Sequence, residues 1–594
     1  MCGSGFGLNH QAQNQNERRR TTMISITAAW YSLLLLAIEP GSVVESFLLR
    51  RTQQSGERPR IFSATAAPPS SVELPWILDT EQFGPFQQDR DWGFVYSAVS
   101  PEQACTSYVI KDVEGKIPAG LKGTYYKIGP GNFERGGKNY EHVLDGDGFV
   151  AAFHFDGEEV TYTGRFVESE YFLSEQDEDE IKYRSVFGTQ RPQWFKNVLD
   201  LELKNVANTN ILAWGGRLLA LFEAGIPYEL DPRTLATLQP SKLSPFSEVG
   251  TDSGLARGIT IDQGGPADQL LGTSSKYFTA HPHVVDDDTI AAFVSTTSVQ
   301  DSLTQLEFVE YDRQWKLKRT VPFSFPKGMA PHDFSASDNH YIFFQNPFAD
   351  MDNMSYVLGL KGPAQIIQLR LRQPTILHVV NRDTAATTQI ELPSYFNIHT
   401  VSKARESKDG KLTIMSNGWD LTDERFFPQS QETVPFLGAW GGPYPDFDSG
   451  RVPPSYLFRT IVDLPTGAVI SHEQVAPGHV IEFPMQDERN DAVYCSLAAT
   501  NDISVPGTGF CRYNADDSVD YWWAPHRIFT GELHPVPKDN SRGSWLLGML
   551  YDAGRKRTSL AIFDSERFTK GPVCQLHLGH HVTYGLHSTF SVPV

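Results

Sequence analysis

Short stretches in which apolar and polar residues alternate recur along the chain from about Val72 to its C-terminus. Turn-forming sequences such as FDGEE, LPTG and NADD separate these stretches. Alternation with a period of two between Gly/Asp turns predicts β-strands, and few stretches carry the 3.6-residue period of a helix. The clearest expected strands span residues 124–129, 149–155, 160–167, 217–223, 289–297, 341–346, 375–380 and 544–552.

Evenly spaced strands over ~520 residues predict an all-β fold, which could be a sandwich, a barrel or a propeller. No tandem sequence repeat is evident, so the WD40 and kelch signatures are absent. A propeller is the most economical of the three for so long a strand pattern, because its blades each close four strands around a central axis.

The N-terminal residues 1–72 depart from the strand pattern. Three arginines, at positions 18–20, precede the apolar run AAWYSLLLLAI at 28–38. A positive flank followed by a short apolar core is typical of a signal peptide, and the run is too short for the ~20 residues of a bilayer span. Simple secretion, a membrane anchor and a true start at Met23 are the alternatives.

The segment 46–71 follows this run and is rich in Arg and Ser, with Glu57 as its one acid. That composition is typical of a transit peptide. A signal followed by a transit peptide resembles the two-part plastid address of algae with complex plastids. We therefore predict a targeting segment over 1–72, plastid localisation with the secretory pathway as the alternative, and one catalytic domain over 73–594.

Composition narrows the classes of function. The net charge is -20 and no long basic stretch occurs, which argues against nucleic-acid binding because that requires clustered Lys and Arg. The five cysteines include no CxxC motif, so neither a disulfide framework nor a thiolate zinc site is indicated. Any metal would therefore have to be held by histidines and carboxylates.

Four of the 17 histidines lie at or beside the ends of expected strands. They occur in the sequences FTAHPHV, MAPHDFS, NIHTVS and GLHSTF, and are His281, His332, His399 and His587. Their separations are on the scale of propeller blades and do not match the i, i+4 spacing of a helical metal site. In a propeller the inner strands approach one axis, so these residues could converge. A lone histidine is more often structural, and spacing alone leaves the metal site a hypothesis.

An ordered set of motifs resembles the carotenoid cleavage oxygenases, the family that also includes the retinoid isomerohydrolase of the eye. The resemblance covers roughly residues 72–594. The motifs, in chain order, are GTYYKIGPGNFE (123–134), HVLDGDGFV (142–150), GRFVESE (164–170), KNVANTN (204–210), GRLLALFEAGIPYELDPRTLATL (216–238), FTAHPH, PHDF, EFP (482–484) and GELHPVP (531–537).

The resemblance implies a seven-bladed β-propeller with iron(II) on its central axis and a helical and loop cap over a substrate tunnel. The positions that match the family's four histidine ligands are His281, His332, His399 and His587. In the AHPH sequence His281 aligns with the family's ligand, and His283 is the alternative.

The resemblance also implies a set of groups around these ligands. Three glutamates, Glu223, Glu482 and Glu532, match residues that accept hydrogen bonds from the second ring nitrogens of three ligands. Such carboxylates fix the imidazole tautomer and raise its basicity. Thr209 matches a residue whose side chain crowds a coordination position left over by the histidines.

The implied reaction is cleavage of a conjugated C=C bond of a carotenoid or apocarotenoid, with Fe(2+) as cofactor and dioxygen as co-substrate, to give aldehydes or ketones. One alternative is an isomerase or isomerohydrolase that uses iron as a Lewis acid. A second is an oxygenase that cleaves stilbenoids or lignin fragments. A third is a propeller without catalytic activity that serves as an interaction scaffold, because fold alone does not imply activity.

A water-insoluble polyene substrate predicts peripheral contact with a membrane. The insert at 347–367 carries a set of apolar residues that could form an interfacial patch, although an ordinary packed loop is an equal interpretation. The apolar residues are Met351, Met354, Tyr356, Val357, Leu358 and Leu360.

The sequence departs from the family pattern at three places. Lys127 and Ile128 stand where Arg-Asn is common, and Ser588 follows His587 where Gly is usual. After His399, Ser402 and Lys403 replace the usual Asn-Ala. These changes remove no ligand, and they leave the subfamily and the substrate open.

Overall fold

The computed structural model describes residues 88–592, except for 224, 239–276, 299–302, 327–330, 350–351, 438–451, 499–506 and 540–542. The predicted targeting segment 1–72 and its boundary with the catalytic domain at 73 lie outside the described residues, so both stay predictions.

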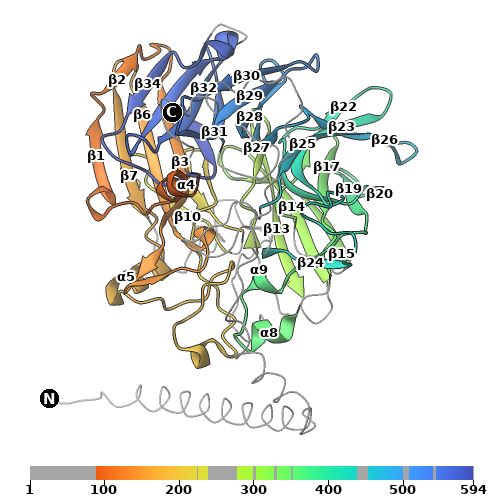
Figure 1. The fold of residues 1–594 in the computed structure, drawn as a ribbon. Coiled ribbons are helices and arrows are strands. Elements are labelled where there is room, and N and C mark those ends of the chain that lie inside the picture. The colour runs from red at the N-terminus through yellow and green to blue at the C-terminus, as the bar shows by residue number, and fades with distance from the viewer. Residues whose placement is uncertain are drawn as a thin grey trace, which may run out of the picture. The chain divides into compact units, whose positions relative to one another are not determined.

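Within this part of the chain, seven antiparallel sheets of three or more strands form the blades of a propeller (Figure 1). The first blade contains β1 (Cys105–Val109), β7 (Val160–Phe166), β6 (Asp147–Phe155), β3 (Gly123–Asn132) and β35 (Ser588–Ser591). The second contains β8 (Asn210–Trp214), β9 (Arg217–Leu221) and β10 (Tyr228–Leu230). The third contains β11 (Tyr277–Phe278), β12 (His283–Asp286), β13 (Thr289–Ser298), β14 (Leu303–Tyr311) and β15 (Leu317–Pro326).

The remaining four blades follow in chain order. The fourth contains β16 (Ser335–Ala336), β17 (His340–Gln345), β19 (Thr375–Asn381) and β20 (Thr387–Leu392). The fifth contains β21 (Tyr395–Thr400), β22 (Arg405–Glu406), β23 (Lys411–Asp420), β25 (Ser455–Asp463) and β26 (Ala468–Val475). The sixth contains β27 (Val480–Asp487), β28 (Ala492–Ala498), β29 (Gly509–Tyr513) and β30 (Val519–Trp523). The seventh contains β31 (Ile528–Pro537), β32 (Ser544–Asp552), β33 (Arg557–Asp564), β34 (Cys574–His577) and β2 (Val113–Gly115).

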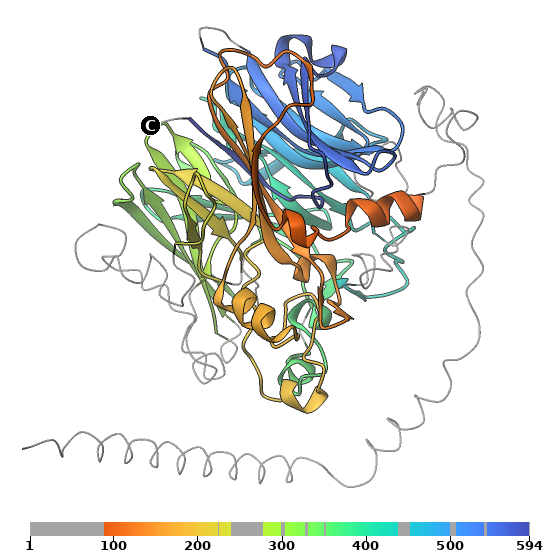
Figure 2. The same ribbon diagram turned by 90° about the vertical axis from the view of Figure 1, so that its left-hand side faces the viewer.

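The two ends of the domain close the ring of blades. Strand β35, near the C-terminus, pairs with β3 of the first blade, and β2, near the start of the domain, pairs with β34 of the seventh. Figure 2 shows the first and last blades side by side, in orange and blue. Each of these two blades therefore holds strands from both ends of the domain, so neither sheet is complete until the two ends have been brought together.

The core lies between the faces of neighbouring blades. In β7 the side chains alternate between buried and partly buried positions, as the period-two pattern predicts. Between the third and fourth blades the rings of Phe308 and Tyr341 stack with centroids 4.4 Å apart. All eight stretches expected to be strands are strands in the structure, and the all-β propeller prediction is confirmed.

Helices are short. They are α4 (Gln88–Val95), α5 (Glu170–Glu178), α8 (Asn353–Val357) and α9 (Pro363–Ile366), with 3-10 turns that include η3 (Trp194–Asn197). Both views place α5, α8 and α9 together at one end of the blades (Figure 1, Figure 2). Among the described residues no helix combines the length and hydropathy needed to cross a membrane.

The inner edge strands of five pairs of neighbouring blades contact each other. These contacts join β12 to β16, β21 to β27, β27 to β31, β31 to β35, and β35 to β8. Side chains on or directly beside this inner ring of strands therefore come together, although they are far apart in the sequence.

Candidate metal centre

The inner ring of strands brings the four predicted histidines together. His399 lies on β21, and the other three lie in the short segments directly before β12, β16 and β35. Side-chain nitrogens of His281, His332 and His399 lie within 4.8 Å of one another. The ring centroid of His587 lies 4.8 Å from that of His281 and 4.9 Å from that of His399. The four imidazoles therefore form one cluster.

Three of these imidazoles have a carboxylate close to the same ring atom, Nδ1, and for His399 and His587 the contact is a hydrogen bond. His332 Nδ1 lies 2.8 Å from Glu223 Oε1. His399 Nδ1 lies 3.0 Å from Glu482 Oε2, and His587 Nδ1 lies 2.9 Å from Glu532 Oε1. A proton on each Nδ1 leaves the lone pair on Nε2, which is the form of imidazole that binds a metal.

The fourth imidazole is arranged differently. His281 is 4% exposed, and its Nε2 is buried without a hydrogen bond, with Glu223 Oε1 at 3.6 Å. A buried polar atom without a partner costs free energy unless a ligand satisfies it. Four imidazole nitrogens suit iron, zinc, copper or nickel. These residues therefore fit a bound transition metal, and their donor atoms do not choose among these ions.

The electrostatics of the cluster favour charged carboxylates and a neutral His281, whereas the pKa of His399 is raised because Glu482 outweighs the effect of burial. Burial by itself would raise the pKa of Glu482, but the adjacent imidazole of His399 holds it below its usual value. Burial likewise opposes ionisation of Glu532, and Lys127 and His587 outweigh it, so its pKa is lowered. Burial lowers the pKa of His281 to about 3. A neutral imidazole is the form that metal binding requires.

His283, the alternative to His281, lies outside the cluster. Its Nε2 lies 2.8 Å from Asp333 Oδ1, and its ring packs on Phe334 with centroids 5.0 Å apart. Asp333 also accepts hydrogen bonds from the backbone amides of Phe334 and Thr400. His283 is therefore part of the packing that supports β12 and β16.

Thr209 lies beside the carboxylate that holds His332. It is 8% exposed, and its Oγ1 lies 3.4 Å from Glu223 Oε2 and 3.3 Å from Asn208 Oδ1. Its position directly before β8 places it on the inner ring. The structure therefore places Thr209 next to the imidazole cluster, within hydrogen-bond range of one of its carboxylates.

Phe483 is an aromatic neighbour that the sequence analysis did not single out. Its ring centroid lies 5.8 Å from that of His399 and 5.5 Å from that of His587. Its φ of 54° is unusual for a bulky residue, and this conformation lets its backbone N–H donate to Glu482 Oε2 at 2.6 Å. The EFP motif that contains it was the available signal.

Lys127 is a second such residue. It lies on β3 and is 3% exposed. Its Nζ donates to the carbonyl oxygen of Leu586 at 2.5 Å and lies 3.6 Å from Glu532 Oε2. Burial lowers the pKa of Lys127 to about 8, although Glu532 opposes the shift. In the sequence it was noted as a departure from the family pattern, without a role.

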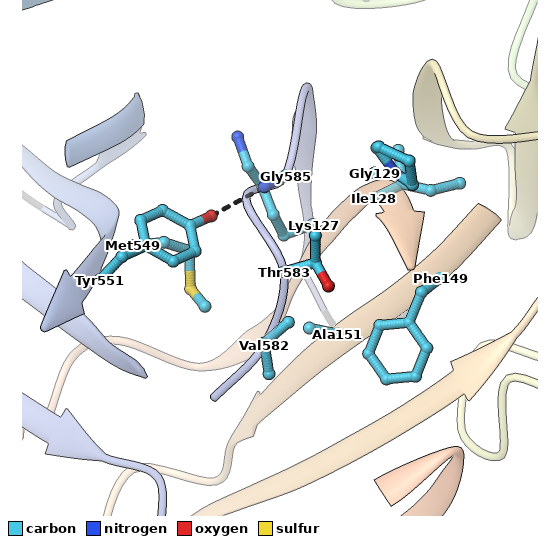
Figure 3. Close-up of a pocket in the computed structure, with 11 residues that line it drawn as sticks. Lys127, Ile128, Gly129, Phe149, Ala151, Met549, Tyr551, Val582, Thr583 and Gly585 are labelled. Carbon is cyan, nitrogen blue, oxygen red and sulfur yellow. Dashed lines mark hydrogen bonds between the residues drawn. The ribbon is translucent and has the colours of Figure 1, made fainter. Parts of the chain in front are cut away.

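A small cavity of about 10 Å³ lies beside Lys127, between β3, β6, β32 and residues 582–585 (Figure 3). Its wall is mainly apolar and includes Phe149 and Met549. Figure 3 shows the hydrogen bond that the backbone amide of Gly585 donates to Tyr551 Oη, at 2.9 Å. This bond fixes the segment that leads to His587.

Comparison with known proteins agrees with this geometry. Residues 98–592 match the family model described as retinal pigment epithelial membrane protein, RPE65. The chain is 31% identical to apocarotenoid-15,15'-oxygenase of Synechocystis over 514 residues, which are 84% of this chain and 96% of that protein. It is 27% identical to carotenoid cleavage dioxygenase 7, chloroplastic, of Oryza sativa, over 78% of this chain and 85% of that protein.

Solved structures show the same architecture. A variant of Synechocystis apocarotenoid oxygenase superposes with a TM-score of 0.73 at 28% sequence identity, over 85% of this chain and 99% of that chain. A cobalt-substituted form of the same oxygenase gives a TM-score of 0.72 at 28% identity, with the same coverage. The latter is a protein of this fold with a metal bound.

Proposed function

The chain belongs to the RPE65 family of carotenoid cleavage oxygenases, and on this premise we propose that it is an iron(II)-dependent dioxygenase that cleaves a conjugated C=C bond of a carotenoid or apocarotenoid. The products are two aldehydes or ketones. The observation that carries the proposal is the cluster of His281, His332, His399 and His587, in which three rings have a carboxylate close to Nδ1.

The protein's part in this reaction is to bind the metal ion and to orient the imidazoles that would bind it. A bound iron(II) ion would supply the centre at which dioxygen is activated. Glu223, Glu482 and Glu532 lie against Nδ1 of their histidines and favour the proton there, so that each Nε2 would keep its lone pair free to bind the ion. Thr209, whose Oγ1 lies 3.4 Å from Glu223 Oε2, would limit the space on that side of the ion.

The proposed substrate class rests on the named relatives and on the chemistry of the site. The two relatives reported above are an apocarotenoid oxygenase and a carotenoid cleavage dioxygenase. Phe483 presents an aromatic ring directly beside the rings of His399 and His587. An apolar, aromatic wall suits a polyene, which offers no group for a hydrogen bond along its conjugated chain.

The test is product analysis with oxygen accounting. Purified protein is loaded anaerobically with iron(II), then supplied with β-carotene, an apocarotenal or a stilbenoid under ¹⁸O₂. We expect dioxygen uptake equal to substrate loss, and mass spectrometry should show label in both carbonyl products of a carotenoid or apocarotenoid. Product without dioxygen uptake would indicate an isomerase instead. Turnover of the stilbenoid alone would show that stilbenoids, and not carotenoids, are the substrate class.

We also propose that the protein contacts a membrane surface. Two segments expose large apolar side chains next to each other, and a hydrogen bond from Leu199 N to Val357 O joins them. We call these residues the apolar patch: Trp194, Phe195, Leu199, Met354 and Leu360, which are 55–73% exposed. Clustered exposed apolar residues are typical of an interfacial contact.

The exposure of the insert residues changes which of them the proposed membrane contact includes. Of the insert residues expected to form it, Met354 and Leu360 are exposed, while Tyr356, Val357 and Leu358 are partly buried. Tyr356 donates a hydrogen bond to the carbonyl of Leu201. Met351 lies outside the described residues. The proposed contact therefore combines part of the insert with the segment around η3.

Plastid localisation remains a proposal that rests on the composition of residues 1–72. The Oryza sativa relative is named as chloroplastic, which is in keeping with it. A fluorescent protein fused behind residues 1–72 should accumulate in the plastid of an alga with complex plastids. Secretion of the fusion protein would support the alternative address.

A further inference from the structure

Glu532 differs from the other two carboxylates of the cluster because a buried lysine lies against it. Lys127 Nζ is 3.6 Å from Glu532 Oε2, and the two side chains are 3% and 1% exposed. Among the described residues, Glu223 and Glu482 form ion pairs with histidines and with no lysine or arginine. The charge of one carboxylate in the cluster is thus balanced and the charges of the other two are not.

The site of Lys127 is built to hold an ammonium group. Its Nζ donates to the carbonyl oxygen of Leu586, and it lies 5.6 Å from the centroid of the Phe483 ring. Gly585 leaves room for the stem of the lysine, since a Cβ on Gly585 would lie 2.8 Å from Cγ and 2.9 Å from Cε of Lys127. Figure 3 shows the lysine running past Gly585.

Ser588 completes the surroundings of this carboxylate. Its Oγ donates to Glu532 Oε2, while Oε1 binds His587 Nδ1 at 2.9 Å. Oε2 of Glu532 therefore accepts a hydrogen bond from a hydroxyl and forms an ion pair with an ammonium group, and Oε1 binds the imidazole. Both Lys127 and Ser588 occupy positions where this chain departs from the common family pattern.

We propose that Lys127 is a positioning residue that balances the charge of Glu532 and thereby stabilises the bound metal in its divalent rather than its trivalent state. The inference rests on the proposed metal centre. In a water-poor interior a charge acts over several ångströms with little screening. Without the ammonium group the surroundings of the metal gain one net negative charge. A more negative environment stabilises the ion of higher charge, so the ion loses an electron more readily.

The same argument predicts opposite effects for the two partners. Lys127→Met removes a positive charge and should lower the potential of the Fe(III)/Fe(II) couple. Glu532→Gln removes a negative charge and should raise it. The double variant Lys127→Met/Glu532→Gln replaces both charges by neutral groups of similar shape, so its potential should lie between those of the single variants. Lys127→Arg keeps the charge and should behave as the wild type.

The experiment is a redox titration of each folded variant after anaerobic loading with iron(II), followed by electron paramagnetic resonance of the ferric form. Folding is checked by circular dichroism and iron content by elemental analysis. A lowered potential in Lys127→Met together with recovery in Lys127→Arg supports the inference. If Lys127→Met does not fold, the double variant still decides, because its potential must then lie below that of Glu532→Gln.

Failure of the inference and failure of the proposed function give different results. Variants that load iron but share the wild-type potential overturn the role of Lys127 and leave the metal centre intact. A wild-type protein that takes up no iron overturns the metal centre, and the inference fails with it. A purely structural role of Lys127 would lower folded yield and leave the potential of the remaining folded protein unchanged.

Discussion

His281 and His283 are separated by one residue, yet the His281 ring lies in the imidazole cluster and the His283 ring contacts Asp333 outside it. The His281 ring lies 4.4 Å from the ring of His332, whereas His283 Nε2 lies 2.8 Å from Asp333 Oδ1. Residues i and i+2 of a strand share a face, but β12 begins at His283, so His281 lies outside the strand alternation. The AHPH sequence therefore supplies His281 to the imidazole cluster and His283 to the packing against Asp333 and Phe334.

Removing either histidine should separate these two roles. We expect His281→Ala to lose metal during dialysis, because one of four imidazole donors is gone. His283→Ala should retain metal and lose about 1–3 kcal/mol of stability, since Asp333 is left with one hydrogen bond fewer. Elemental analysis and thermal unfolding measure the two effects. Metal loss in His283→Ala with retention in His281→Ala would reverse the assignment.

Glu482 should raise the metal affinity of the site through its hydrogen bond to His399, without binding the metal itself. Glu482→Gln keeps the shape of the side chain and removes the charge that holds the proton on His399 Nδ1. Loss of such an outer carboxylate typically weakens metal binding by about 10–100-fold. Competition with a chelator measures the affinity. Glu391→Gln, at an exposed position on β20, is the matched control and should leave affinity unchanged. Equal affinities in both variants would contradict the role of Glu482.

Much of the fold was predictable because it depends on local alternation. The stretches at 149–155 and 544–552, for example, are strands β6 and β32 in the structure. The ordered motifs identified the four histidines. They did not show which carboxylate pairs with which of the three histidines His332, His399 and His587. That pairing depends on which inner strands are neighbours, as with His399 on β21 and Glu482 on β27.

Other features depend on contacts that no local pattern carries. A lysine is almost never fully buried unless it is paired, so the sequence gives no reason to place Lys127 inside the protein. Its burial follows from the approach of Glu532, some 400 residues later in the chain, to the same inner ring. The apolar patch has the same origin, because its two segments are joined only in the folded structure, by the hydrogen bond from Leu199 N to Val357 O.

Asp145 should make stability depend on pH. It is 1% exposed, and burial raises its pKa to about 6, although Thr189 and Phe187 donate hydrogen bonds to it. The folded state therefore binds this proton more tightly than the unfolded state, whose pKa is ~3.9. The stabilisation is fully present below that value and is lost as the pH rises to about 6. Two pKa units correspond to about 3 kcal/mol.

Asp145→Asn isolates this effect, because asparagine does not titrate. The difference in unfolding free energy between wild type and Asp145→Asn, from urea titrations, should shift by about 3 kcal/mol against the wild type between pH ~3.5 and ~6.5. Other groups titrate in both proteins and cancel in the difference. A difference that stays constant over this range would show that the carboxyl group titrates normally.

The apolar patch should govern binding to lipid. Trp194→Asp and Leu360→Asp, alone and combined, place charges where the proposed contact buries apolar side chains, which are 73% and 55% exposed in the free protein. The free energy of inserting an apolar side chain into a membrane surface is favourable in proportion to the area removed from water. Inserting a carboxylate is unfavourable. Co-sedimentation with liposomes should therefore fall, with iron content unchanged. Ile470→Asp, at an equally exposed apolar position on β26, should bind liposomes as the wild type does. Loss of binding in Ile470→Asp to the same extent would mean that added negative charge, and not the patch, controls the interaction.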